Sequence, residues 1–362
     1  MTDATDTAPV STDWRLDWPT SGGERVASAL LKCAPEDFFV DEELPPLEDL
    51  VAGGEHLCIR LEKRGDNTDY VARQLATLSG CRHFDVGFCG LKDRHAVTRQ
   101  WFSVYRPGQE EEDTAFLEEV AKSWRVLEHH RRARKLRRGD HRGNYFELVL
   151  KEVRGAPDAV DQALTRVRDQ GCPNYFGPQR FGHNGANLDR ALAMDSSKLN
   201  RRGSRNAKKR GRGRSTSGSG DSKNVLYFSA ARSWLFNEVL AYRVQNGTWL
   251  VPQEGEPGTG DNQDIMVTGP LWGDGGTDAV SVQGEIERTA VSRHPGLEAV
   301  FATTRMKPER RPLRMVPEAL DWQWQGGDQL LLKFRLAPGQ YATTMLSDVF
   351  EITDATRETG QG

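Results

Sequence analysis

Residues 90–104 read Gly-Leu-Lys-Asp-Arg-His-Ala-Val-Thr-Arg-Gln-Trp-Phe-Ser-Val and place one carboxylate, Asp93, among basic neighbours. Apolar side chains alternate with polar or small ones over residues 84–88, and two-residue alternation returns over residues 101–105. A period of two is typical of strands, so the sequence predicts two strands joined by a loop that carries Asp93. Such an Asp could act as a nucleophile or general base, but a turn Asp paired with Lys92 or Arg94 is the common structural alternative.

The bulk composition fits a globular protein whose charges are unevenly distributed along the chain. The chain has 362 residues, 37% hydrophobic and 28% charged, which allows two domains or one large one. Its net charge of -3 does not by itself point to a nucleic-acid partner, yet seven of the twelve residues from Arg131 to Arg142 are Lys or Arg. This cluster indicates either a local site for a polyanion or a solvated charged face.

Cysteine and histidine usage predicts neither a disulfide framework nor a metal site. The five cysteines are odd in number and include no Cys-x-x-Cys pair, and the eight histidines have no metal-ligand spacing. The segment Met1–Thr12 is polar and does not resemble a signal peptide, and no apolar stretch is long enough to span a membrane. We therefore expect a cytoplasmic protein with reduced thiols, no metal and no membrane association.

Gly, Pro and helix-capping residues mark the boundaries of the predicted helices, strands and loops. We expect a loose tail over residues 1–26, and loops with short strands over residues 248–300. The basic segment 198–223, with nine Lys or Arg among residues 198–214, is expected to be disordered. Strands are predicted within 30–40, 145–153 and 330–336, and helices at 66–80, 157–171, 234–246 and 341–350.

The stretch that carries Asp93 resembles the signature of the TruD family of tRNA pseudouridine synthases, Gly-x-Lys-Asp-x-x-Ala-x-Thr-x-Gln-Trp. The resemblance implies that Asp93 is the catalytic nucleophile. It also implies an α+β fold. A pseudouridine synthase catalytic domain with a mixed, largely antiparallel sheet would comprise residues 27–172 and 314–362, and an inserted α/β TRUD domain would comprise residues 173–313.

Two further segments resemble the family. Asn174-Tyr-Phe-Gly-Pro-Gln-Arg-Phe-Gly182 combines aromatic residues with Arg180, which suits RNA binding, although a packed hydrophobic loop is the alternative. The second segment joins Arg134-Lys-Leu-Arg137 to Gly143-Asn-Tyr-Phe146. Its cations would contact phosphates, which set affinity and register. The resemblance implies that Asn144 contacts the target nucleotide and that Phe146 stacks on the target base. The candidate contacts to the RNA backbone are Arg134, Lys135, Arg137 and Arg180.

Motifs near the two ends of the chain add three substrate-binding candidates. Leu31-Lys-Cys-Ala-Pro-Glu-Asp-Phe38 resembles the family's Lys-x-x-Pro-Glu-Asp-Phe, which implies that Lys32 lies beside the catalytic Asp and that Phe38 touches the substrate. A cation there would favour the ionised form of Asp93. The segment 336–343 departs from the family pattern, because Ala337-Pro338 reverses the usual order and Tyr341 replaces a Phe.

The implied reaction is the isomerisation of uridine to pseudouridine in tRNA, at position 13, with the target base flipped out of its stack. It involves no redox change, so no cofactor is expected. Asp93 could attack the ribose, attack the base or remove a ribose proton. The expected partner is tRNA, no protein partner is evident, and the family resemblance implies a monomer. The alternatives are a non-catalytic RNA-binding protein or RNA chaperone, which would not need Asp93, and a methyltransferase, which would need a Gly-rich cofactor loop after a strand.

Overall fold

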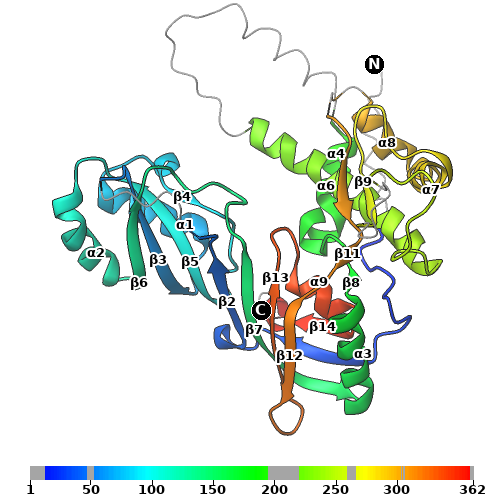
Figure 1. The fold of residues 1–362 in the computed structure, drawn as a ribbon, viewed down its shortest axis with the longest axis horizontal. Helices are drawn as coiled ribbons and strands as arrows, with labels where there is room; N and C mark the ends of the chain where they lie inside the picture. The colour runs from blue at the N-terminus through cyan, green and yellow to red at the C-terminus, as the bar shows by residue number, and fades with distance from the viewer. Residues whose placement is uncertain are drawn as a thin grey trace, which may run out of the picture. The chain divides into compact units, whose positions relative to one another are not determined.

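The computed structural model describes residues 13–46, 53–194, 220–258, 266–302, 304 and 306–358. The chain divides into two compact units. Figure 1 shows its helices and strands coloured by residue number. The sheet unit comprises Arg25–Gly171, Val316–Ala342 and Val349–Gly362, and the helical unit comprises Met1–Glu24, Cys172–Met315 and Thr343–Asp348. The sheet unit is therefore interrupted in sequence, and Asp93 belongs to it.

A ten-stranded mixed sheet organises the sheet unit. Seven of its strands follow one another in the order β12-β13-β7-β2-β5-β3-β6, while β1 pairs with β14 and β7, and β4 pairs with β5. The strands are β1 (Ala27–Leu31), β2 (Phe38–Glu43), β3 (His56–Arg64), β4 (Gly87–Phe88), β5 (Val97–Tyr105), β6 (Arg125–Arg132), β7 (Gly143–Gly155), β12 (Glu318–Trp324), β13 (Leu330–Leu336) and β14 (Phe350–Asp354).

Most neighbouring strands of this sheet are antiparallel. Among the strands that the structure describes, only the β1–β14 and β2–β5 pairs are parallel, and the long strand β7 pairs with β1, β2 and β13. The sheet is thus mixed and largely antiparallel, and the predicted α+β class is confirmed. The strand predicted over 84–88 is shorter than expected, because residues 83–85 form a 3₁₀ turn before β4 begins.

Helices cover one face of β3 and β5, where Leu57, Ile59 and Phe102 form part of a buried core. The helices of this unit are α1 (Thr68–Ser79), α2 (Asp113–Ala121), α3 (Pro157–Gln170) and α10 (Ala355–Glu358), with 3₁₀ turns η1 (Pro35–Asp37), η2 (His83–Asp85) and η3 (Glu110–Glu112). The α1 boundaries follow from local chemistry. Asn67 Oδ1 accepts a hydrogen bond from the Tyr70 amide at 2.8 Å, and Gly80 ends the helix with a left-handed φ of 70°.

The helical unit packs around α6 (Gly220–Gln245). Its remaining elements are β8 (Cys172–Pro173), η4 (Pro178–Phe181), η5 (His183–Gly185), α4 (Ala186–Leu192), β9 (Thr268–Leu271), α7 (Ser281–Ser292), α8 (Pro295–Phe301), β10 (Glu309–Pro312) and β11 (Arg314–Met315); α9 (Ala342–Ser347) falls almost entirely within the same unit. The strands form two antiparallel pairs, β9–β10 and β8–β11. The helix predicted over 341–350 ends earlier than expected, since Phe350 begins β14.

Part of the predicted N-terminal tail is packed rather than loose. Trp14 and Trp18 are both buried in the core of the helical unit, where the Trp18 ring stacks on Tyr175 with centroids 5.6 Å apart. Trp14 Nε1 also donates to Asp189 at 2.8 Å. The expectation of a loose tail is therefore wrong for this segment, because two large aromatic rings bury enough apolar surface to hold it. Residues 1–12 lie outside the described residues.

Two other expectations for this unit are revised. Residues 248–300 were expected to form loops and short strands, but they contain the helices α7 and α8. Most of the segment 198–223, predicted to be disordered, lies outside the described residues, while its last residues begin α6.

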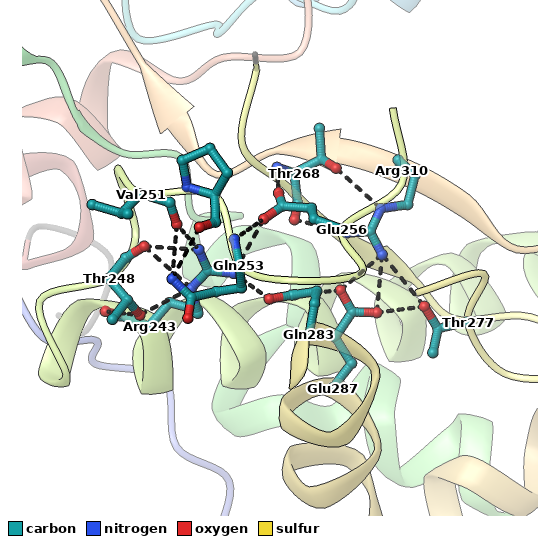
Figure 2. A network of polar contacts seen from close by, with 11 residues as sticks. Arg243, Thr248, Val251, Gln253, Glu256, Thr268, Thr277, Gln283, Glu287 and Arg310 are labelled. Atoms are coloured by element: carbon teal, nitrogen blue, oxygen red, sulfur yellow. Dashed lines mark hydrogen bonds and ion pairs between the residues drawn. The ribbon is translucent and has the colours of Figure 1, made fainter. Parts of the chain in front are cut away.

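A polar network joins α6, α7 and the β9–β10 pair (Figure 2). The Glu287 carboxylate accepts two hydrogen bonds from Arg310 Nη1, at 2.8 and 2.9 Å, and a third from Gln283 at 2.5 Å. Gln283 also binds Arg243, whose Nη2 donates to the carbonyl of Val251 at 2.6 Å. The side chains of Arg243 and Glu287 are fully buried. The network therefore supplies buried polar contacts to α7, while Ala290 and Val291 of the same helix pack in the apolar core.

Candidate active site

The loop that carries Asp93 is fixed at its base by buried hydroxyl and amide groups. Thr68 Oγ1 accepts a hydrogen bond from the Lys92 amide and donates to Gln100 Oε1, both at 2.9 Å. Gln100 Nε2 in turn donates to the Gly90 carbonyl at 2.7 Å. Because Thr68 and Gln100 are buried, these bonds hold the loop between β4 and β5 in one conformation.

Asp93 forms a close ion pair with Lys32, and its other carboxylate oxygen accepts the His95 amide at 2.9 Å. The Asp93 side chain is 30% exposed, while that of Lys32 is 3% exposed. Burial acts to raise the pKa of Asp93, but the bonds from Lys32 and His95 outweigh it and lower the pKa below its usual value. Asp93 is therefore an ionised carboxylate with a surface open to a ligand.

Lys32 reaches this position from the turn between β1 and η1. Its backbone has a φ of 62°, a left-handed conformation that is uncommon outside glycine. Its ammonium also lies 3.5 Å from the Asp354 carboxylate and 4.7 Å from the centre of the Phe38 ring. The sequence placed Lys32 beside Asp93 correctly, and the structure adds Asp354 as a second carboxylate.

Lys92, next to Asp93 in the loop, points into a buried polar cluster. Its ammonium lies 2.7 Å from Glu42 Oε2 and 2.6 Å from Asn144 Oδ1. Glu42 and Asn144 are directly opposite each other on the paired strands β2 and β7. Gly143 allows β13 to approach here, since a Cβ at this position would lie 2.7 Å from the Leu336 carbonyl oxygen.

The aromatic candidates form one buried group in the sheet unit. Phe146 stacks on Phe334 with centroids 5.2 Å apart, and the Phe38 ring meets Phe146 edge-on at 6.3 Å. Tyr145 points to the other face of β7, as the alternation predicts, and its hydroxyl donates to Glu147 at 2.7 Å. Phe38 and Phe146 are both buried, so each presents only a small ring surface to a base.

Tyr341 is less connected than the other substrate-binding candidates. Tyr341 is 40% exposed. Within the described ranges, no hydrogen bond or ring contact ties the Tyr341 side chain to Asp93 or Lys32. Its predicted role therefore has no geometric support comparable to that of Phe38.

The basic candidates differ in their surroundings. Arg134 and Arg137 are exposed, and the Arg137 amide donates to Asp140 at 2.7 Å. The Lys135 ammonium instead binds the carbonyl of Phe84. Arg134 and Arg137 are therefore the members of this group whose exposure best suits phosphate contacts.

The aromatic segment 174–182 lies in the core of the helical unit. Tyr175, Phe176 and Phe181 are buried there, and Asn237 binds both the amide and the carbonyl of Phe176 at 2.9 Å. The packed-loop alternative is therefore correct for these rings.

Arg180, in the same segment, makes its contacts within the helical unit. Its guanidinium binds the hydroxyl of Ser229 and lies 3.4 Å from that of Ser233.

Several charged or polar residues of the site have no counterpart among the sequence motifs. Glu42, Lys63 and Asp354 were missed, together with the loop contacts of Thr68 and Gln100. Burial lowers the pKa of Lys63 to about 8, although Asp66 and Asp93 act in the opposite direction. A carboxylate on the inward face of β2, in the alternation Phe38-x-Val40-x-Glu42, was the signal available in the sequence for Glu42.

Comparison with known proteins decides the family. The model of the family described as tRNA pseudouridine synthase D (TruD) matches residues 23–189. A tRNA pseudouridine synthase D of Marinobacter nauticus is 57% identical over 351 residues, which cover 94% of this chain and 96% of that protein. The chain belongs to the TruD family. A Pseudomonas putida tRNA pseudouridine synthase D is 37% identical and covers 95% of this TruD chain and 97% of its own length.

A solved structure agrees with the fold of this TruD protein. The putative tRNA pseudouridine synthase D (TruD) of Methanosarcina mazei superposes with a TM-score of 0.61, at 19% identity, over 90% of this chain and 94% of that one. Among the residues that the structure describes, no three His, Cys, Asp or Glu side chains are grouped as metal ligands would be. Within the same part of the chain, no helix is both long and apolar enough to cross a membrane.

Proposed function

We propose that this TruD protein isomerises uridine to pseudouridine at position 13 of tRNA, with Asp93 as the catalytic residue. The ion pair between Asp93 and Lys32 is the observation that carries this proposal. The ion pair keeps the Asp93 carboxylate ionised, and the fixed loop holds this side chain in a defined position. A protein that only binds RNA would not need a buried ammonium to hold one partly exposed carboxylate.

The reaction breaks the bond between uracil N1 and ribose C1′, rotates the base and forms a bond between C5 and C1′. C5 then loses its proton and N1 gains one, so the product is an isomer of uridine. Asp93 supplies the negative charge that starts it, by attack on the ribose, attack on the base or removal of a ribose proton. Phe38 and Phe146 provide ring surface that offsets part of the cost of flipping the base, which is about a few kcal/mol. Asn144 contacts the flipped uracil.

The remaining parts of the proposal concern domains and assembly. We assign residues 27–172 and 314–362 to the catalytic domain and 173–313 to the inserted TRUD domain. The compact units support these limits closely, except that Thr343–Asp348 groups with the helical unit. The protein acts on tRNA in the cytoplasm and is a monomer. It needs no cofactor, since the isomerisation is redox-neutral. Sedimentation with and without tRNA tests the assembly state.

Pseudouridine mapping of tRNA incubated with wild type, Asp93→Asn and Asp69→Asn tests the function. Asp69 is a half-exposed residue of α1 that pairs with Arg73, so Asp69→Asn is the matched control. We expect pseudouridine at position 13 with wild type and with Asp69→Asn, and none with Asp93→Asn. Modification by Asp93→Asn would refute its role, and modification at another uridine would refute the position. Binding of tRNA without modification by wild type would indicate the RNA-binding alternative.

A further inference from the structure

The ammonium of Lys92 determines which way the Asn144 amide faces. Lys92 Nζ lies 2.6 Å from Asn144 Oδ1, and an ammonium group has only hydrogen-bond donors. The amide oxygen must therefore face Lys92, because the reversed orientation would bring two donors together. The Asn144 Nδ2 group is then directed away from Lys92. Within the described part of the chain, Nδ2 donates no hydrogen bond to another protein group.

Glu42 holds Lys92 in this orientation. Its carboxylate lies 2.7 Å from the Lys92 ammonium, and its other oxygen accepts the Trp101 amide at 3.2 Å. The Glu42 side chain is fully buried and that of Lys92 is 7% exposed, so neither ion can exchange its partner for water. The pairing of β2 with β7 places Glu42 and Asn144 opposite each other, which fixes all three groups relative to Asp93 at the neighbouring loop position.

We propose that Glu42 and Lys92 are positioning residues that present the Asn144 amide as a fixed hydrogen-bond donor, and that this donor makes the site select uracil over cytosine. This inference rests on the proposed function, in which Asn144 contacts the target base. Uracil carries a carbonyl oxygen at C4, which accepts from an N–H group, whereas cytosine carries an amino group there. A cytosine would bring its amino donor against the amide donor, and both groups would be left unpaired.

The test measures the ratio of dissociation constants for two tRNA transcripts that differ only by uridine or cytidine at the target position. Asp93→Asn serves as the background, so that no turnover disturbs binding. We expect this background to prefer the uridine transcript by about tenfold, the effect of one unpaired polar contact. Lys92→Met should bring the ratio close to one, because the Asn144 amide can then rotate and present either its oxygen or its NH₂ group to the base. Combining Lys92→Met with Asn144→Ala should lower the ratio no further.

Asn144→Asp provides an independent variant, since it keeps the size of the side chain and offers Lys92 an oxygen. It replaces the donor by an acceptor, so the preference should invert toward the cytidine transcript. Lys151→Met is the matched control, because Lys151 also pairs with a carboxylate, Asp37 at 2.8 Å, and lies further along β7 than Asn144. It should leave the ratio unchanged.

Two outcomes separate the inference from the proposed function. Pseudouridine formation is measured on the uridine transcript with the protein that retains Asp93, and its absence would contradict the function itself. A protein that forms pseudouridine but keeps its uridine preference in both Lys92→Met and Asn144→Asp would overturn the inference. Melting temperatures of all variants show whether each one is folded when its ratio is measured.

Discussion

At the scale of single residues, the site depends on a buried ammonium shared by two carboxylates. Lys32 pairs with Asp93 and lies 3.5 Å from Asp354. Its side chain is 3% exposed, so water does little to screen these charges. The arrangement keeps Asp93 ionised without a second group to remove its proton. The unusual backbone of Lys32 is the local cost of placing the ammonium there.

The pKa of Asp93 leads to a prediction about acid pH. In wild type, the bonds from Lys32 and His95 lower this pKa, so the carboxylate loses its charge only below its ordinary range. Lys32→Met removes the larger of these bonds and leaves the burial that raises the pKa. We therefore expect the acid limb of the rate profile to move to higher pH, in addition to a lower plateau. Single-turnover rates of pseudouridine formation between pH 4 and 8 measure both.

Lys122→Met is the control for this prediction. Lys122 is exposed at the C-terminal end of α2, where it pairs with Glu119, and the acid limb should stay in place. An unshifted acid limb in Lys32→Met would mean that Lys32 does not set the charge of Asp93.

At the scale of elements, the sequence predicted those that have clear alternation or caps. The helix α1 follows from Asn67 and Gly80, and β13 from its alternating apolar residues. The helix α7 escaped prediction because the first part of its buried face carries Gln283, Gly284 and Glu287. Its buried apolar residues are Ala290 and Val291, near the end of the helix. So few buried apolar side chains give only a weak hydrophobic period.

The same polar face predicts that two glutamates of α7 contribute unequally to the free energy of unfolding. Glu287 is buried and pairs with Arg310, whereas Glu285 is exposed on the same helix. Glu287→Gln leaves the guanidinium of Arg310 without its counter-charge, and breaking a buried pair in this way costs about 3–5 kcal/mol. Glu285→Gln should change the free energy of unfolding by less than about 0.5 kcal/mol, as surface substitutions usually do. Urea denaturation of both variants measures the difference, and equal stabilities would show that the network in Figure 2 is not structural.

At the scale of the whole molecule, a net charge of -3 coexists with the basic run at residues 131–142. Binding of a polyanion then depends on where the cations are exposed rather than on their total. Arg134 and Arg137 are exposed in this run.

Replacing both Arg134 and Arg137 by Ala should weaken tRNA binding and flatten its salt dependence. Each lost phosphate contact reduces the slope of log affinity against log salt, by roughly 1.5 in total for two contacts. Arg154→Ala is the control, since Arg154 is exposed on β7 and pairs with Glu152. Titrations of fluorescent tRNA at several salt concentrations give the slopes. A double variant with the wild-type slope would remove these two residues from the RNA interface.

Across the molecule, resemblance located more of the site than residue patterns did. Four residues named from motifs form one series of contacts, from Asp93 through Lys32 and Phe38 to Phe146. Glu42 and Asp354 could not be found this way, because their importance arises from strand pairings between distant segments. The packed N-terminal tryptophans were missed for the same reason, since their partners lie more than a hundred residues away.

The pairing of β1 with β14 has a consequence for how the protein is made. Strand β14 contributes Asp354 and lies beside β1, with the whole of residues 172–315 produced by the ribosome between the two. For most of synthesis, the nascent chain therefore contains Lys32 and Asp93 but lacks Asp354, the second carboxylate beside Lys32. The site becomes complete only when residue 354 has left the exit tunnel, so a truncated translation product lacks a finished site.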